Sequence, residues 1–317
     1  MKPYIFVHCD QSDYSASLRA DARTGLTGFP PWLPSRWCFD GHGRHLFDFL
    51  AEAPGAHVWD AEAIALSEYA AAIAAATAAR QLVYLGPLSR WRLDSLADKM
   101  FGSGRLDGVA VCDCPNGDNA DLESPIPASV PRVERHHLVS DLPGAVPPLP
   151  GTRRLIVCPT VTFATVDSRD RHRLLTGLRK RCAIGDTLLV GAPLPRVPAG
   201  QRGFYADAER FNKNVLNVVN HTLDSDVSEE AFDHAVGYHE RHDRLELRLR
   251  ARTDVRVELR TLGFHIDLAG GQPLRTFILC GLSPERVAAE LREAGFSVRK
   301  RWGASDDMVG LYLADAV

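Results

Sequence analysis

Two aspartates and a glycine, each at the end of a short apolar run, are the residues of this sequence best suited to hold a cofactor. Gly86 ends the run 81–86, and Asp113 and Asp141 end two later runs of the same kind. If the runs are neighbouring strands of a parallel sheet, these residues meet at its carboxyl edge. An aspartate there accepts hydrogen bonds from ribose hydroxyls, and a glycine lets a ligand approach the backbone. In a nucleotide-binding α/β protein the turn at Gly86 would begin a phosphate- or adenosyl-facing loop, but here Pro87 and Leu88 follow, and both aspartates could equally be ordinary turn residues.

Other chemistry-bearing residues carry weaker signals. Cys112, Asp113 and Cys114, with the pair His136-His137, are metal-ligand residue types. Two cysteines separated by one residue suit zinc poorly, so we expect no metal. A cysteine–histidine nucleophile is a second alternative, but no spacing in the sequence fixes a cysteine beside a histidine.

The elements that would position the acidic residues alternate along the chain. Apolar runs of strand length are separated by segments with helical spacing, and alanine supplies helix propensity in the segment before Gly86. This alternation indicates a mostly parallel sheet covered on both faces. Strands are predicted at 81–86, 109–113, 136–141, 154–159 and 187–191, and helices near 61–79, 91–99 and 168–182.

The pattern changes after a segment rich in proline and glycine, residues 192–203, which we interpret as a linker. A helix is predicted from Tyr205 to Leu223. The stretches 244–252 and 255–259 alternate apolar and polar residues, which predicts an antiparallel hairpin with one wet face. Further elements are predicted as strands at 276–280 and 309–313 and as a helix that begins after Ser283.

Composition limits the classes of partner. The chain has 317 residues and a net charge of -3, which gives no electrostatic case for nucleic acid or an anionic membrane. No window reaches the roughly 18 apolar residues that a membrane span needs. Seven scattered cysteines suit a reducing compartment. We expect a cytoplasmic protein that binds a small molecule, with neither nucleic acid nor membrane as a partner, and leave a protein partner open.

Taken together, these segments resemble the histidine-specific Nα-methyltransferase family of ergothioneine biosynthesis, which uses S-adenosylmethionine. The similarity extends from about Leu18 to Leu313. The resemblance implies a Rossmann-like methyltransferase domain, residues 61–196 and 281–317. It also implies a smaller α+β substrate-binding domain, residues 1–60 and 197–280. The most specific segments are 19–27, Asp40 with 46–48, Tyr205 with 211–216, 249–252, and 284–285 with 294–295.

In the cofactor half, the resemblance assigns Gly86, Asp113 and Asp141 to S-adenosylmethionine. Asp113 falls where the family places the acid that binds the ribose. Asp141 falls where the family places the aspartate that faces adenine. The family's Glu-Leu-Gly-Ser-Gly segment, however, is here Tyr84-Leu85-Gly86-Pro87-Leu88. The acid and the second glycine are absent, so S-adenosylmethionine is a candidate cofactor that this loop does not by itself support.

The substrate half departs further from the family. Phe39 replaces a tyrosine of the family. Phe277 and Leu279 replace a glutamate and a serine that, in the family, recognise the imidazole of the substrate histidine. Thr160 to Thr165 replace a Gly-Ser-Thr-Ile-Gly-Asn loop, whereas Tyr205 is retained. Of an aromatic-rich loop, only the final glutamate survives, as Glu62. Removing the polar partners of a buried imidazole costs roughly 1–3 kcal/mol for each group left unpaired.

These departures lead to two expectations about function. The first is a methyltransferase-like enzyme of specialised metabolism that does not act on histidine but on a less polar, amino-acid-like molecule. Its polar anchors would be Thr160, Thr165 and Tyr205, and its apolar wall Phe39, Leu247, Phe277 and Leu279. The alternative is a pseudo-methyltransferase that binds no S-adenosylmethionine and acts as a partner subunit or through different chemistry. The sequence leaves open whether the protein is an enzyme.

Overall fold

The computed structural model describes residues 4–7, 11–51, 57–86, 94–113, 134–139, 146–303 and 307–317. Its largest element is a sheet of eight strands. The first six strands of the sheet are parallel, and the last two form an antiparallel pair. In spatial order they are β1 (Tyr4–Val7), β4 (Glu134–Val139), β3 (Gly108–Asp113), β2 (Gln81–Leu85), β5 (Arg154–Cys158), β6 (Thr187–Pro193), β13 (Val309–Ala316) and β12 (Phe296–Gly303).

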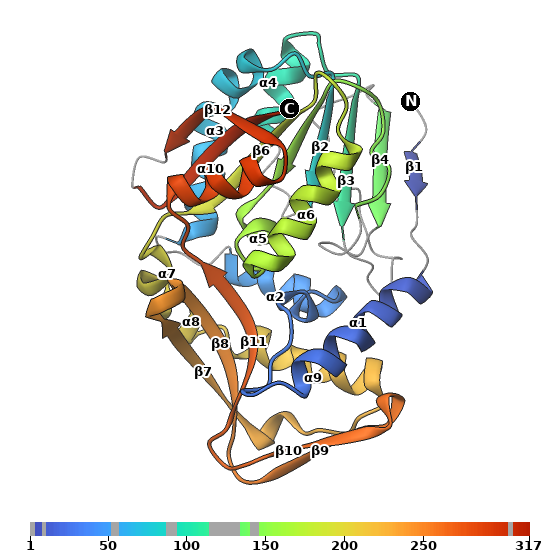
Figure 1. The fold of residues 1–317 in the computed structure, drawn as a ribbon, viewed down its shortest axis with the longest axis vertical. Helices are drawn as coiled ribbons and strands as arrows, with labels where there is room; N and C mark the ends of the chain where they lie inside the picture. Colours follow the sequence, from blue (N-terminus) through green and yellow to red (C-terminus); the bar gives the residue numbers. More distant parts are fainter. Residues whose placement is uncertain are drawn as a thin grey trace.

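Helices cover both faces of this sheet. Along β2, Leu82 and Tyr84 pack in one apolar cluster with α3 (Val58–Ala76) and α4 (Asp94–Gly102). Val83 and Leu85 pack in a second cluster, with α6 (Ser168–Arg181) and α10 (Pro284–Glu293). Every residue of β2 is buried, as expected for a strand covered on both sides. The predicted mostly parallel sheet with two covered faces is therefore confirmed (Figure 1).

The helix termini follow the sequence signals. Asp167 caps α6, because its carboxylate accepts a hydrogen bond from Asp170 N at 3.0 Å. Ser283 caps α10 in the same way, and Pro284 occupies the first turn. The sequence predicted that a helix begins after Ser283, and this is confirmed.

The second part of the molecule is built mainly from the helices α1, α2 and α9 and from two small antiparallel sheets. One sheet has the order β11-β8-β7, and the other pairs β9 with β10. The elements are α1 (Gln11–Leu26), η1 (Ser35–Cys38), α2 (Gly41–Ala51), α9 (Glu209–Leu223), β7 (Phe232–His239), β8 (Arg244–Ala251), β9 (Val255–Leu259), β10 (Phe264–Leu268) and β11 (Pro273–Cys280). Figure 1 shows the arrowheads of β2, β3 and β4 pointing toward this part. The carboxyl edge of the sheet thus faces α1, α2 and α9.

Three sequence expectations were wrong in this region. The hairpin of 244–252 with 255–259 does not form, because β8 pairs with β7 and β11 while β9 pairs with β10. The single helix expected from Tyr205 is divided into α8 (Arg202–Ala206) and α9. The segment interpreted as a linker contains the end of β6 and the short helix α7 (Val197–Gly200).

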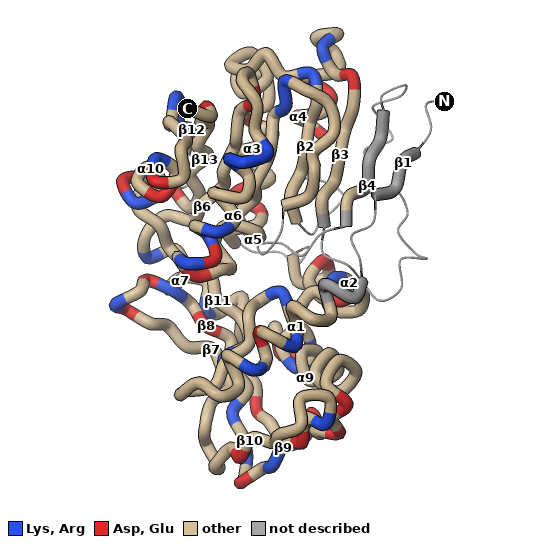
Figure 2. The backbone as a smooth tube through the Cα atoms, turned by 45° about the vertical axis from the view of Figure 1, so that its right-hand side comes forward, with Lys and Arg blue, Asp and Glu red and all other residues tan. Residues whose placement is uncertain are grey.

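Charged residues of both signs are interspersed over both parts of the described chain (Figure 2). At the far end of the large sheet, β12 is an edge strand on which Arg299, Lys300 and Arg301 remain at least partly exposed. Charges of this kind on an edge strand hinder edge-to-edge association.

Candidate functional site

Gly86 lies at the carboxyl end of β2 in a conformation that favours glycine, with φ +109°. Its N–H donates to Cys112 O at 2.6 Å, which joins it to the end of β3. A Cβ at this position would lie 1.9 Å from Thr162 Oγ1. Thr162 belongs to α5 (Thr160–Phe163) and donates from its hydroxyl to Leu85 O at 2.8 Å. The turn therefore depends on a glycine, which brings the ends of two parallel strands and a short helix together.

One of the two predicted acidic partners, Asp113, lies along the same edge of the sheet. Asp113 is the last residue of β3 and pairs in register with Val139 of β4. Asp141 lies outside the described residues, as do Pro87 and Leu88. The structure thus brings Gly86 and the backbone of Asp113 to one edge, at the place where open α/β sheets bind ligands.

Glu62 is a buried carboxylate at this edge, and the sequence expectations did not assign it to the site. It is 1% exposed on α3, and its Oε1 accepts from Thr160 N at 2.7 Å and from Thr160 Oγ1 at 2.8 Å. Gly191 of β6 leaves room for it, because a Cβ there would lie 1.9 Å from Glu62 Oε1. The signal that could have identified Glu62 was its survival in an otherwise altered family loop.

The predicted anchor Thr165 makes hydrogen bonds through both its hydroxyl and its carbonyl. Its hydroxyl donates to Val161 O at 2.6 Å, and its carbonyl accepts from Ser35 Oγ at 2.7 Å. Ser35 Oγ also accepts from Ile278 N at 3.1 Å. One serine of η1 therefore ties the loop after β5 to strand β11, and so joins the large sheet to the second part.

The residues predicted to form an apolar wall lie in a buried cluster of aromatic rings. Phe39 packs edge-on against Phe211 with ring centres 5.5 Å apart, and Phe277 lies 6.4 Å from Phe39. Tyr205 lies 5.7 Å from Phe277, and Phe47 lies 5.1 Å from Phe39. Each ring is no more than 5% exposed. The cluster extends the core between the two parts, and aromatic pairs in this geometry stabilise beyond the area they bury.

The two predicted leucines lie on the strands beneath this cluster. Leu247 of β8 pairs in register with Phe277 of β11, and Leu279 pairs with Leu245. Both are completely buried. The structure therefore brings together Phe39, Tyr205, Leu247, Phe277 and Leu279, whereas Thr160 and Thr165 belong to the adjoining segment at the carboxyl edge.

A buried polar network holds the tyrosine of this cluster. His234 Nε2 lies 2.9 Å from Tyr205 O, and its Nδ1 lies 2.8 Å from Asn212 Nδ2. A carbonyl can only accept, so Nε2 carries the proton and Nδ1 accepts from the amide. Asn212 also donates to Arg248 O at 3.0 Å and accepts from the Thr276 hydroxyl. Burial lowers the pKa of His234, against the hydrogen bond to Tyr205 O that raises it, so the ring is neutral.

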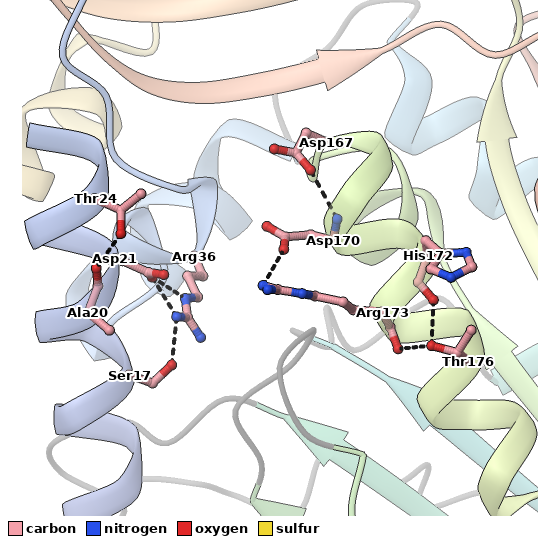
Figure 3. A network of polar contacts seen from close by, with 10 residues as sticks. All are labelled: Ser17, Ala20, Asp21, Thr24, Arg36, Asp167, Asp170, His172, Arg173 and Thr176. Atoms are coloured by element: carbon pink, nitrogen blue, oxygen red, sulfur yellow. Dashed lines mark hydrogen bonds and ion pairs between the residues drawn. The ribbon is translucent and has the colours of Figure 1, made fainter. Parts of the chain in front are cut away.

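A second network fixes the segment that carries Phe39. Figure 3 shows Arg36 of η1 directed at Asp21 of α1, with the α6 residues Asp170 and Arg173 beyond it. Arg36 Nε donates to Asp21 Oδ2 at 2.7 Å, and its guanidinium also donates to Ser17 Oγ at 2.8 Å. A guanidinium held at two points fixes η1 against α1, and Phe39 follows directly after η1.

Other kinds of site have less support. Within the described ranges, no group of three or more histidine, cysteine, aspartate or glutamate side chains is placed to hold a metal ion. Burial, followed by the charge of Glu62, raises the pKa of the Cys158 thiol, which disfavours a thiolate nucleophile. No helix among these residues is long and apolar enough to cross a membrane.

The family model and two sequence relatives agree on one family. A family model for histidine-specific, S-adenosylmethionine-dependent methyltransferases matches residues 18–316. A histidine Nα-methyltransferase of Mycolicibacterium smegmatis is 33% identical over 303 residues, covering 94% of each chain. One of Mycobacterium tuberculosis is 30% identical and covers 99% of each chain. Among solved structures, the methyltransferase CcbJ of Streptomyces caelestis matches with a TM-score of 0.44 at 17% identity, covering 85% of this chain and 95% of CcbJ.

These findings overturn the expectation that the protein avoids histidine in favour of a less polar molecule, and with it the pseudo-methyltransferase alternative. The two relatives that match nearly the full length, at 33% and 30% identity, are histidine Nα-methyltransferases. The expectation was wrong because it gave three apolar substitutions more weight than similarity along the whole chain. Phe39 and Phe277 are core residues that pack on each other, and buried polar groups such as Glu62 remain nearby.

Proposed function

Because this chain belongs to the family of histidine-specific, S-adenosylmethionine-dependent methyltransferases, we propose that it transfers a methyl group from S-adenosylmethionine to the α-amine of histidine. The observation that carries the proposal is similarity to two histidine Nα-methyltransferases over nearly the full length of both chains. The fold supports it, since the carboxyl edge of the large sheet faces the second part of the molecule (Figure 1). We also propose a cytoplasmic setting, which the five free cysteines of the described chain support.

We assign residues 61–196 and 281–317 to the methyltransferase domain and residues 1–60 and 197–280 to the substrate-binding domain. The cofactor would lie at the carboxyl edge, held by Gly86, Asp113 and Asp141. In the described part of this edge, Gly86 and Asp113 end two neighbouring parallel strands, which supports a ligand at this place. S-adenosylmethionine supplies an electrophilic methyl group on a sulfonium.

The acceptor amine requires hydrogen-bond acceptors, and the site offers them. Thr160 Oγ1 donates its own proton to Glu62, so toward a ligand this oxygen acts as an acceptor. The Thr165 hydroxyl is committed as a donor to Val161 O and can accept in the same way. We propose that these two oxygens, with the Tyr205 side chain and the Glu62 carboxylate, hold the amino-acid end of the substrate.

The apolar residues would position the substrate and exclude water from one side of the site. Phe39, Leu247, Phe277 and Leu279 would form the wall against which the substrate lies. Their burial keeps this side of the site rigid and free of water. In methyl transfer the protein chiefly aligns the amine with the sulfonium methyl, and well-oriented reactants account for about 7–11 kcal/mol of barrier lowering in model reactions.

The test is a methyl-transfer assay with purified protein, labelled S-adenosylmethionine and histidine, followed by mass spectrometry of the product. We expect Nα-methylated histidine. Asp113→Asn should raise KM for S-adenosylmethionine by about tenfold or more, because it weakens hydrogen bonds to the ribose. The matched control is Asp107→Asn, which changes an exposed ion pair with Arg80 just before β3 and should leave KM unchanged. Methylation of other amines without histidine, or no methylation of any amine, would refute the proposal.

A further inference from the structure

The outer face of the β11-β8-β7 sheet contains a cavity of about 430 Å³ lined by charged groups. Three arginines line it, Arg244, Arg248 and Arg275, together with Glu246 and the indole of Trp32. Leu245, Leu247 and Leu249 of β8 point to the opposite face and are completely buried in the core. The cavity therefore lies across the sheet from the aromatic cluster and is separate from the proposed methyl-transfer site.

Two backbone features place the arginines there. The register of β11 against β8 shifts between Arg275 and Phe277, so Thr276 is an extra residue in the strand. Residues two apart normally share a face, but this bulge lets Arg275 line the cavity while Phe277 joins the core. Gly237 of β7 is the second feature, since a Cβ there would lie 2.8 Å from the guanidinium carbon of Arg248. Glycine within a strand often marks such a close approach.

The charges in the cavity do not balance. Glu246 accepts from Arg244 Nε at 2.7 Å and from Arg248 Nε at 2.9 Å. Arg275 is 3.9 Å from the same carboxylate, beyond hydrogen-bond distance. Three guanidiniums thus share one carboxylate, which is 5% exposed. The cavity has an excess of positive charge.

Arg275 is the group most in need of a further anion. Its side chain is 17% exposed, and within the described chain its Nε has no hydrogen bond. The guanidinium lies over Trp32, 5.2 Å from the ring centre. Burial, and next the charge of Arg244, lower the pKa of Arg275, whereas the arginines keep the pKa of Glu246 low despite the burial that would raise it. Both directions agree with the excess of arginine over carboxylate among the side chains that line the cavity.

We propose that this cavity is a binding site for a small molecule that carries a carboxylate or a phosphate group. The oxyanion would lie against the Arg275 guanidinium, whose planar fork suits either group. The remaining body of the ligand would pack against Trp32. The volume suits a metabolite, because ligand pockets measure about 300–1,000 Å³.

The experiment is calorimetric titration of the full chain with two probes, inorganic phosphate and succinate. We expect at least one of them to bind. Arg275→Gln should weaken that binding by about tenfold or more, which is the loss of one or two charge-assisted hydrogen bonds. Glu246→Gln should tighten it, because it removes the internal competitor for the arginines. Loss of stability alone would not move the two variants in opposite directions.

The matched control is Arg252→Gln, which alters an exposed arginine just after β8 that pairs with Asp233 and does not line the cavity. It should leave binding unchanged. If Arg275→Gln fails to fold, Arg275→Lys keeps the charge without the fork and should bind with intermediate affinity. Binding of only one probe identifies the ligand class. The proposal is overturned if neither probe binds, or if both arginine-to-glutamine variants weaken binding equally.

Discussion

Asn212 offers the sharpest test of how the second part of the molecule is held together. The residue is completely buried on α9. Its amide donates to His234 Nδ1 at 2.8 Å and to Arg248 O at 3.0 Å, and it accepts from the Thr276 hydroxyl. Asn212→Ala leaves three buried polar groups without this partner. At about 1 kcal/mol or more for each, the free energy of unfolding should fall by about 3 kcal/mol.

The measurement is thermal unfolding by calorimetry, compared with Asn217→Ala on the same helix. Asn217 is exposed and bonds Glu229 Oε1 at 2.8 Å, so its loss should change stability by less than about 0.5 kcal/mol. For Asn212→Ala we expect Tm to fall by about 6 °C, at about 2 °C for each kcal/mol in a large domain. A loss no greater than that of Asn217→Ala would refute the view that this network holds Tyr205 and β11 in place.

Asn212→Asp separates hydrogen bonding from packing. The carboxylate keeps the size of the side chain but cannot donate to His234 Nδ1. It favours a protonated ring, so the pKa of His234, which burial lowers in the native protein, should rise. NMR titration of the His234 ring would measure the change, and an unchanged pKa would contradict the assigned tautomer.

Three further predictions concern stability. Gly86→Ala should lower the free energy of unfolding by about 1–3 kcal/mol, because φ is +109° and the new Cβ would lie 1.9 Å from Thr162 Oγ1. Asp186→Ala should cost about 3–5 kcal/mol, since it leaves the buried Arg154 guanidinium, 3.0 Å away, without its carboxylate. The unfolding free energy should decrease as pH falls below 6.5, where the unfolded chain binds a proton at His234 that the folded chain, with its lowered pKa, does not.

Each of these predictions has a direct check by chemical denaturation. Asp107→Ala breaks an ion pair with Arg80 whose side chains are 41% and 44% exposed, and it should cost no more than about 1 kcal/mol. Equal losses for the buried and exposed aspartates would contradict the role of burial. His234→Gln should remove part of the decrease in stability at low pH. If the variant shows the same decrease, other groups cause it.

The large sheet could be predicted from the sequence because its strands are continuous apolar runs. Burial on both faces removes any need for polar positions in β2, β5 and β6, and such runs are visible without knowledge of their neighbours. The small sheets could not be predicted so well. β7 carries His234, Gly237 and other partly exposed residues, so its sequence lacks a clear period. Because β7 was not recognised in the sequence, the alternating stretches 244–252 and 255–259 were predicted to pair with each other.

The candidate site was predictable only in part, for a related reason. Phe39, Tyr205, Leu247 and Phe277 could be grouped by resemblance, and the structure does bring them together. Polar contacts between distant segments leave no local pattern. The Glu62–Thr160 bonds join residues 98 positions apart, which no spacing rule detects.

The bulge at Thr276 determines which side chains of β11 face the charged cavity and which face the aromatic core. Without it, Arg275 and Phe277 would share a face, and either an arginine would enter the aromatic core or a phenylalanine would face the charged cavity. Burying an unpaired guanidinium is far more costly than a bulge. The Thr276 hydroxyl donates to the amide oxygen of Asn212 and lies 3.1 Å from Leu247 O, so the bulge is fixed by the network that positions Tyr205. The anion cavity and the aromatic cluster therefore depend on the same few backbone atoms, although they lie on opposite faces of the sheet.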